Sequence, residues 1–270
     1  MTNLHSYFER IQHDGTVSCD LQTLRSIVFA HATSIPFEGL DPLAGVSVSL
    51  EHDAIFDKLV RRQRGGYCFE QNALLSWALR KVGFDVAELS ARVWYNTPEG
   101  VTPPRTHIFL AVTIDGKRWL ADCGVGGSTP TGLMELDRIG DEQNLLNETR
   151  RIVVIEGRHV PTFLHQVKQG DTWSDVYEFT GETMPKIDQE MGNWWTSRHP
   201  DSKFRKNVIV ALLNRDGTRT SLVNNAFLHR RAEEILERIE IRSREQLDAL
   251  LRERFGLDLP ATADVRSLFV

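Results

Sequence analysis

Cysteine is scarce in this chain of 270 residues, and its placement excludes several kinds of site. The three cysteines, Cys19, Cys68 and Cys123, are odd in number, far apart and without a C-x-x-C pair, so neither a disulfide framework nor a structural zinc site is expected. The nine histidines form no H-E-x-x-H motif and no close cluster with cysteine. We therefore expect no metal centre.

Long apolar runs and dense basic segments are also missing. No stretch approaches the roughly 18 apolar residues of a membrane-spanning helix, and residues 1–15 lack the apolar core of a signal peptide. The 32 basic and 37 acidic residues give a net charge of −5, without a basic run suited to a nucleic acid backbone. We expect a cytoplasmic globular protein that binds neither nucleic acid nor membrane.

One stretch stands out, the run Arg64-Gly65-Gly66-Tyr67-Cys68 followed by a long helical pattern that ends at Gly83. The two glycines carry no side chains, so a substrate could approach the backbone there. Cys68 then lies in the first turn of a helix, where free amide groups and the helix dipole favour the thiolate. Most free cysteines are small core residues, but this context favours a nucleophile.

Residues 1 to about 84 form a predicted helical unit around this cysteine. Asp20 is a plausible N-cap for a helix that ends before Pro36. A second short helical pattern contains Ile55, Leu59 and Val60. Arg64 belongs to a basic cluster that either faces solvent or pairs with Glu38 to fix the loop.

Two strand-like runs, 107–114 and 117–123, flank Asp115-Gly116, the favoured pair for a two-residue type I′ hairpin. Such a loop fixes the register, and Asp122 then lies diagonally from His107 on the same face. That relation spans about 7–8 Å between backbones and is within reach of long side chains. A three-residue loop would place the two on opposite faces. Taken alone, Asp122 could simply cap the turn that follows it.

The glycine-rich turn from Gly124 to Pro130 lacks the last glycine of G-x-G-x-x-G and the lysine of a phosphate-binding loop, so no dinucleotide site is predicted. Its amides could cradle a pyrophosphate or make a tight turn, and the sequence leaves both open. Strand-like runs at 152–155, 163–167 and 175–179 predict an antiparallel sheet or barrel through about residue 188. A second hairpin candidate at 208–223 follows.

A final helix closes the predicted order. Ser243 and Gln246 have capping-box spacing, and Gly256 ends the apolar stripe.

Cys68, His107 and Asp122 together supply the parts of acyl transfer. His107 would take the thiol proton, and Asp122 would orient the imidazole and stabilise its charged form. The segments around these residues resemble the arylamine N-acetyltransferases, and the resemblance spans most of the chain: Arg64-Gly65-Gly66-Tyr67-Cys68-Phe69-Glu70-Gln71-Asn72, Pro104-Arg105-Thr106-His107, Asp122-x-Gly-x-Gly, Ile35-Pro36-Phe37-Glu38 and Ser202-x-Phe204-x-x-Asn207.

The resemblance implies an α+β fold with a cysteine-protease-like Cys-His-Asp core. A helical domain at 1–84 would carry the nucleophile, an antiparallel β-barrel at 85–188 would carry the histidine and aspartate, and an α/β lid would span 189–270. Acetyl-coenzyme A would acylate Cys68, and an arylamine, hydrazine or arylhydroxylamine would then take the acetyl group in a ping-pong cycle of xenobiotic metabolism. No tightly bound cofactor is implied, and the chain would act as a monomer or homodimer.

The resemblance also implies binding residues. The backbone near Cys68 and the residues Thr106, Gly124, Gly126 and Gly127 would form oxyanion and coenzyme contacts. The walls of the acceptor pocket would be Phe37, Val125 and Phe204.

Three positions depart from the family pattern. Val125 stands where the family usually has phenylalanine, so we expect a wider acceptor pocket that favours bulkier amines. Cys123 is expected to be a packing residue. Gly39, where the family commonly has asparagine, receives no functional interpretation.

Other functions use the same triad. A thiol peptidase or transglutaminase-like enzyme would take its acyl group from a peptide or glutamine amide, and an amide synthase from a carrier-bound acyl chain. A catalytically idle acyl-coenzyme A binding protein would not need all three residues.

Overall fold

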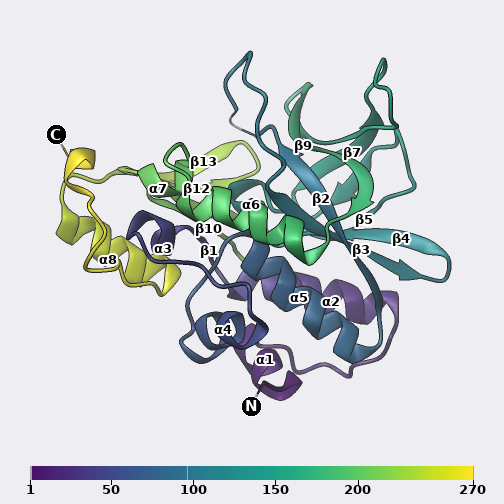
Figure 1. Cartoon of the computed structure of the whole chain (residues 1–270), viewed down its shortest axis with the longest axis horizontal. Coiled ribbons are helices and arrows are strands. Elements are labelled where there is room, and N and C mark those ends of the chain that lie inside the picture. Colours follow the sequence, from purple (N-terminus) through teal and green to yellow (C-terminus); the bar gives the residue numbers. More distant parts are fainter. Residues whose placement is uncertain (1, 96, 270) are drawn as a thin grey trace.

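The computed structural model describes residues 2–95 and 97–269, which build two antiparallel sheets and a set of helices around them (Figure 1). The helices are α1 (Leu4–Ile11), α2 (Leu21–Ser34), α3 (Leu40–Leu43), α4 (His52–Phe56), which continues as a π-helical turn at Asp57–Arg61, α5 (Cys68–Val82), α6 (Lys186–Arg198), α7 (Lys203–Lys206) and α8 (Arg244–Phe255). Short 3₁₀ turns lie at Gly126–Ser128 and Arg266–Phe269. Within the described ranges, no helix is both long and apolar enough to span a bilayer.

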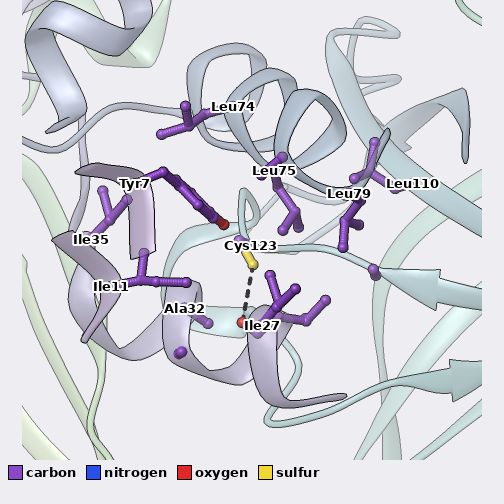
Figure 2. Close-up of a cluster of buried hydrophobic side chains, with 14 of the residues drawn as sticks. Tyr7, Ile11, Ile27, Ala32, Ile35, Leu74, Leu75, Leu79, Leu110 and Cys123 are labelled. Carbon is purple, nitrogen blue, oxygen red and sulfur yellow. Dashed lines mark hydrogen bonds between the residues drawn. The ribbon is translucent and has the colours of Figure 1, made fainter. Parts of the chain in front are cut away.

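The two long predicted helices of the N-terminal part are confirmed at both ends, and the short pattern with Ile55, Leu59 and Val60 forms α4 and the π-helical turn after it. The Asp20 carboxylate accepts a hydrogen bond from the Thr23 amide at 2.7 Å, and α2 ends at Ser34 ahead of Pro36. Helix α5 begins at Cys68 and ends at Val82, with Gly83 as its C-cap, whose φ of 111° suits glycine. These helices share one apolar core, in which Figure 2 shows leucines of α5 facing Ile11 and Ile27.

The predicted hairpin is formed by β3 (His107–Ile114) and β4 (Lys117–Ala121). Asp115 and Gly116 both have positive φ, 51° and 75°, as a type I′ turn requires. Ile114 pairs with Lys117 and Leu110 with Ala121, which is the predicted register.

The hairpin belongs to an eight-stranded antiparallel sheet that curls into a nearly closed barrel. Its strand order is β5 (Met134–Glu135), β4, β3, β2 (Asp85–Val93), β9 (Thr172–Thr183), β8 (Phe163–Gln169), β7 (Glu148–Val154) and β6 (Gln143–Leu145). The Gln143 side chain crosses the seam between the edge strands, accepting from the Glu135 amide at 2.8 Å and donating to its carbonyl at 3.0 Å. The predicted antiparallel barrel is confirmed.

The second sheet has the order β1 (Phe37–Glu38), β10 (Ile209–Leu213), β11 (Arg219–Val223), β12 (Ala226–Arg231) and β13 (Glu234–Glu240). Helix α8 packs on it, capped by Ser243 and ended by Gly256 as predicted. The predicted hairpin of β10 and β11 is confirmed. Strand β1 comes from the N-terminal part of the chain, so this sheet is not built from residues 189–270 alone. The domain boundaries at 84 and 188 stay a prediction.

Candidate active site

Cys68 is the first residue of α5, and its side chain is buried apart from 5% of its surface. The sulfur lies 3.5 Å from the carbonyl oxygen of Thr106, just before β3. The Glu70 carboxylate accepts from the Tyr67 amide at 3.2 Å and caps the same helix end. The amides of Glu70 and Gln71 donate to the Tyr67 carbonyl oxygen at 3.0 and 2.9 Å. Within the described part of the chain, this leaves the first-turn amides of Cys68 and Phe69 to face an anionic group.

His107 and Asp122 form the contact that the register predicts. His107 Nε2 lies 2.8 Å from Asp122 Oδ2, and both side chains are almost fully buried. Burial disfavours the charged ring, but the Asp122 carboxylate outweighs it, with a further contribution from Cys68, and raises the pKa of His107 to about 10. Burial also disfavours the carboxylate, yet the imidazole holds the pKa of Asp122 below its usual value. Because Nε2 is engaged, Nδ1 is the ring nitrogen that remains for the thiol.

Asn72, one helical turn after Cys68, holds the aspartate in place. Its amide nitrogen lies 2.9 Å from Asp122 Oδ1 and 2.6 Å from the Ile108 carbonyl oxygen, while its oxygen accepts from the Cys123 amide at 3.0 Å. The motif contained Asn72, but its role was not predicted. The spacing of four residues from Cys68 was the available signal, because it places both on one face of the helix.

Gly124 is required by close packing around the nucleophile. Its amide donates to Asp122 Oδ1 at 2.8 Å, so the aspartate caps the turn and binds His107 at once. A Cβ at Gly124 would lie 2.6 Å from the Cys68 Cα and 2.7 Å from Asn72 Nδ2. Only glycine brings the turn this near to α5 without displacing it.

Protein atoms fill the space that a side chain would occupy at Gly65 and Gly66, so close packing explains both glycines. The approach of a substrate to this backbone stays a prediction. A Cβ at Gly65 would collide with the Pro36 carbonyl oxygen, and one at Gly66 would lie 2.8 Å from the Glu70 carboxylate. The Gly66 amide donates to Pro36 O at 3.2 Å. These glycines let the segment before Cys68 pack against β1 and the helix cap.

A buried network of charged side chains lies next to the segment that precedes Cys68. Lys58 Nζ is 2.7 Å from Glu70 and 2.8 Å from Asp41, and Arg64 binds Glu38 at 2.7 Å and Asp41 at 2.6 Å. Arg64 thus makes the predicted pair with Glu38 and is not on a solvated face. Three carboxylates share two cations here, and burial, only partly offset by Lys58, raises the pKa of Glu70 to about 7. The network fixes the loop that delivers Cys68.

Two of the three predicted acceptor-pocket residues come together beside the nucleophile. The rings of Phe37 and Phe204 lie 6.0 Å apart, in one buried cluster with Cys68. Val125 instead packs in the cluster inside the barrel. Gly39 now has a structural explanation, since a Cβ there would collide with the Phe204 ring.

Cys123 lies on the opposite side of the Gly124 turn, in the helical core. Figure 2 shows its thiol among leucines of α5. The thiol donates to the carbonyl oxygen of Val28 at 3.6 Å. Burial raises the pKa of Cys123 well above its usual value. Its surroundings are those of a packing residue.

A small cavity of about 80 Å³ with several cationic groups opens next to Gly127. Glu148 Oε2 accepts from Arg150 and Arg219, each at 2.8 Å, and Arg230 donates to the Gly127 carbonyl at 2.9 Å. The Nε groups of Arg150 and Arg230 have no partner within the part of the chain that the structure describes. Basic groups with spare donors are suited to an anion.

Thr106, another of the predicted coenzyme contacts, borders a different cavity of about 340 Å³ with Arg105 and Trp195. The structure therefore does not bring Thr106 and Gly127 to one cavity, although Thr106 O contacts the nucleophile. Across the described ranges, no group of three or more His, Cys, Asp or Glu side chains is arranged to hold a metal ion.

Comparison with known proteins decides which family has this arrangement. The family model described as N-acetyltransferase matches residues 20–265. The arylamine N-acetyltransferase of Mycolicibacterium smegmatis is 41% identical over 262 residues, covering 95% of this chain and 92% of the relative. This chain belongs to the arylamine N-acetyltransferase family.

Solved structures of arylamine N-acetyltransferases agree with the fold. The Salmonella typhimurium structure matches with a TM-score of 0.89 and 32% identity, covering 100% of this chain and 98% of the other. A Mycobacterium marinum arylamine N-acetyltransferase, solved in complex with CoA, matches with a TM-score of 0.88 and 35% identity over 98% of this chain and 97% of the other. The Salmonella relative, 34% identical, is also named N-hydroxyarylamine O-acetyltransferase. The expected α+β class of the resemblance is confirmed.

Proposed function

We propose that this chain transfers an acetyl group from acetyl-coenzyme A to the nitrogen of an arylamine or hydrazine, or to an arylhydroxylamine, through an acetyl-Cys68 intermediate. The observation that carries the proposal is the His107–Asp122 contact of 2.8 Å beside a cysteine at a helix start. Family membership supplies the acyl donor and the class of acceptor.

In the first half of the cycle, His107 holds the proton that Cys68 gives up. The thiolate attacks the thioester carbonyl carbon, and the developing oxyanion faces the first-turn amides of α5. The C–S bond to coenzyme A then breaks, and the leaving thiolate takes the proton from His107. Asp122 keeps the ring oriented through Nε2 throughout.

In the second half, the acceptor nitrogen attacks the acetyl carbon on Cys68. His107, now neutral, accepts the proton that the nitrogen loses, and the Cys68 thiolate leaves as the amide forms. Phe37 and Phe204 provide apolar surface for the aryl ring beside the sulfur.

The coenzyme is proposed to lie along the turn from Gly124 to Gly127. Gly124 packs against Cys68, and Gly127 borders the cavity with Arg150 and Arg230, so the turn connects the nucleophile with an anion-binding region. One coenzyme molecule could then place its thioester at Cys68 and its phosphates at the arginines. Gly126, with φ of 65°, is the bend between them.

Intact mass after mixing with acetyl-coenzyme A, without any amine, tests the route directly. We expect one acetyl adduct on the wild type that disappears when an arylamine is added, and none on Cys68→Ala. Cys19→Ala is the matched control, because that thiol is free and exposed. An adduct on Cys68→Ala, or one that no amine discharges, would contradict the cycle. Reaction only with carrier-bound acyl chains or peptides would favour the amide synthase or peptidase.

We also propose that the protein acts in the cytoplasm as a monomer or homodimer. The three free thiols, Cys19, Cys68 and Cys123, fit a reducing compartment, where a cysteine nucleophile stays active. Light scattering of the purified chain distinguishes the two assemblies from larger ones.

A further inference from the structure

Lys203 stands at the edge of the proposed acceptor pocket. It is the first residue of α7 and precedes Phe204, and its Nζ lies 5.6 Å from the centroid of the Phe204 ring. That ring packs in the same buried cluster as Phe37 and Cys68. The ammonium group of Lys203 therefore lies over a ring that itself packs in the cluster around the nucleophile.

The segment that carries Lys203 is held firmly. The Ser202 hydroxyl accepts from the Phe204 amide at 3.3 Å and donates to the Thr196 carbonyl oxygen. The Phe204 ring lies directly on Gly39, where no side chain would fit. The position of the lysine relative to the pocket is thus set by the fold.

Lys203 differs from the neighbouring basic residues in its contacts. Lys206 pairs with Asp201 at 3.2 Å, and Arg205 donates to the Arg198 carbonyl oxygen at 3.0 Å. For Lys203, no carboxylate lies within 4.0 Å in residues 2–95 and 97–269. Its ammonium group is available to an anion that the protein does not provide.

The ammonium group of Lys203 lies in the electrostatic field of the nucleophile Cys68. The residue keeps accessible surface, yet the protein around its ammonium is dense enough for burial to lower the pKa of Lys203, which the charge of Cys68 partly opposes. A partly desolvated cation gains more from an ion pair than a fully solvated one.

Building on the proposed function, we propose that Lys203 selects arylamine acceptors that carry a carboxylate on the ring, away from the amine. The aryl ring would lie against Phe204 and Phe37, with the amine toward acetyl-Cys68 and the carboxylate toward Nζ. An uncharged acceptor of the same shape would lack this ion pair.

Steady-state kinetics with two matched amines test this selectivity. The measured quantity is the ratio of kcat/KM for para-aminobenzoate to kcat/KM for para-aminobenzamide, which have similar size and differ in charge. Comparing this ratio between variants cancels the difference in amine reactivity. In Lys203→Met we expect the ratio to fall about tenfold, equivalent to about 1.4 kcal/mol.

Two variants separate a specific contact from a general charge effect. Lys203→Arg keeps the positive charge and is expected to keep the ratio within about threefold of wild type. Lys206→Met removes one positive charge from the same short helix, where the ammonium already pairs with Asp201, and should leave the ratio unchanged. Added salt should lower the ratio in wild type more than in Lys203→Met. Thermal unfolding of each variant verifies that it is folded.

A ratio in Lys203→Met that equals the wild-type ratio, or an equal fall in Lys206→Met, would overturn the inference and leave the proposed function intact. Failure of the proposed function looks different. In that case wild type would form no acetyl adduct, or would acetylate neither amine, and the inference would fall with it.

Discussion

Replacing Glu148 by glutamine removes one negative charge from a buried group of cations with almost no change in volume. Glu148 Oε2 accepts from Arg150 and Arg219 at 2.8 Å, and Oε1 accepts from the amide and hydroxyl of Thr131 at 2.7 and 2.9 Å. Only 1% of the Arg150 side chain and 9% of the Arg219 side chain are exposed. Since the variant leaves buried charges unpaired, we expect the free energy of unfolding to fall by about 3–5 kcal/mol.

The pH dependence of stability gives a similar value for the contribution of Glu148 to the free energy of unfolding. Burial would raise the pKa of Glu148, but Arg150 and Arg219 outweigh it and lower the pKa from 4.5 to about 2. The difference, 4.5 − 2 = 2.5, corresponds to about 3 kcal/mol. Because the folded-state pKa is the lower one, this stabilisation is present above pH 4.5 and is lost as the pH falls toward 2.

Urea unfolding of wild type and Glu148→Gln between pH 7 and pH 3.5 checks both statements. The stability difference should be constant down to about pH 4.5 and shrink below it. Glu142→Gln is the matched control, because Glu142 pairs with Lys168 at 3.1 Å on the surface and its loss should cost about 0–1 kcal/mol. A loss at pH 7 no larger in Glu148→Gln than in this control would refute the reasoning.

Three further substitutions test the site. Gly124→Ala should slow acylation of Cys68 by about 100-fold or more, because the new methyl group displaces the nucleophile. Rapid-quench mass spectrometry measures this rate, and a rate equal to that of wild type would contradict the packing argument. Asn72→Ala should lower the free energy of unfolding by about 1–3 kcal/mol, because it leaves the buried Ile108 carbonyl and Cys123 amide without partners. Denaturant titration tests this, and unchanged stability would count against it. Val125 packs in the barrel cluster, so its predicted place in the wall of the acceptor pocket stays a prediction. If the side chain also reaches the pocket, Val125→Phe will shift kcat/KM toward smaller amines, and unchanged selectivity across amines of increasing size would disprove the expectation.

The sequence predicted the hairpin and the helix of the nucleophile because short-range rules determine them. Asp115-Gly116 fixes the loop length, the loop fixes the register, and the register brings Asp122 to His107. The end of α5 follows from Gly83, the left-handed glycine at which the helical pattern was predicted to stop.

What the sequence did not predict depends on long-range contacts or on ambiguous patterns. Glu148 meets Arg219 across 71 positions of chain, and no local rule pairs them. Strand β13 reads Glu-Ile-Leu-Glu-Arg-Ile-Glu, whose charges resemble an exposed helix as much as an edge strand. Helix α6 contains Gly192, which lies close to the Phe69 ring and interrupts the helical pattern for a reason visible only in the packing.

The two residues of β1 join the nucleophile to the C-terminal sheet mechanically. Phe37 pairs with Ala211 of β10 on one side, and on the other the Glu38 amide donates to the Gly66 carbonyl oxygen at 3.0 Å, two residues before Cys68. A displacement of that sheet would be transmitted through β1 to the loop at Gly66, which positions the Cys68 thiol. The C-terminal part is therefore not an exchangeable module: a chimera that takes it from a relative must preserve the pairing of Phe37 with Ala211, or the nucleophile loses its alignment.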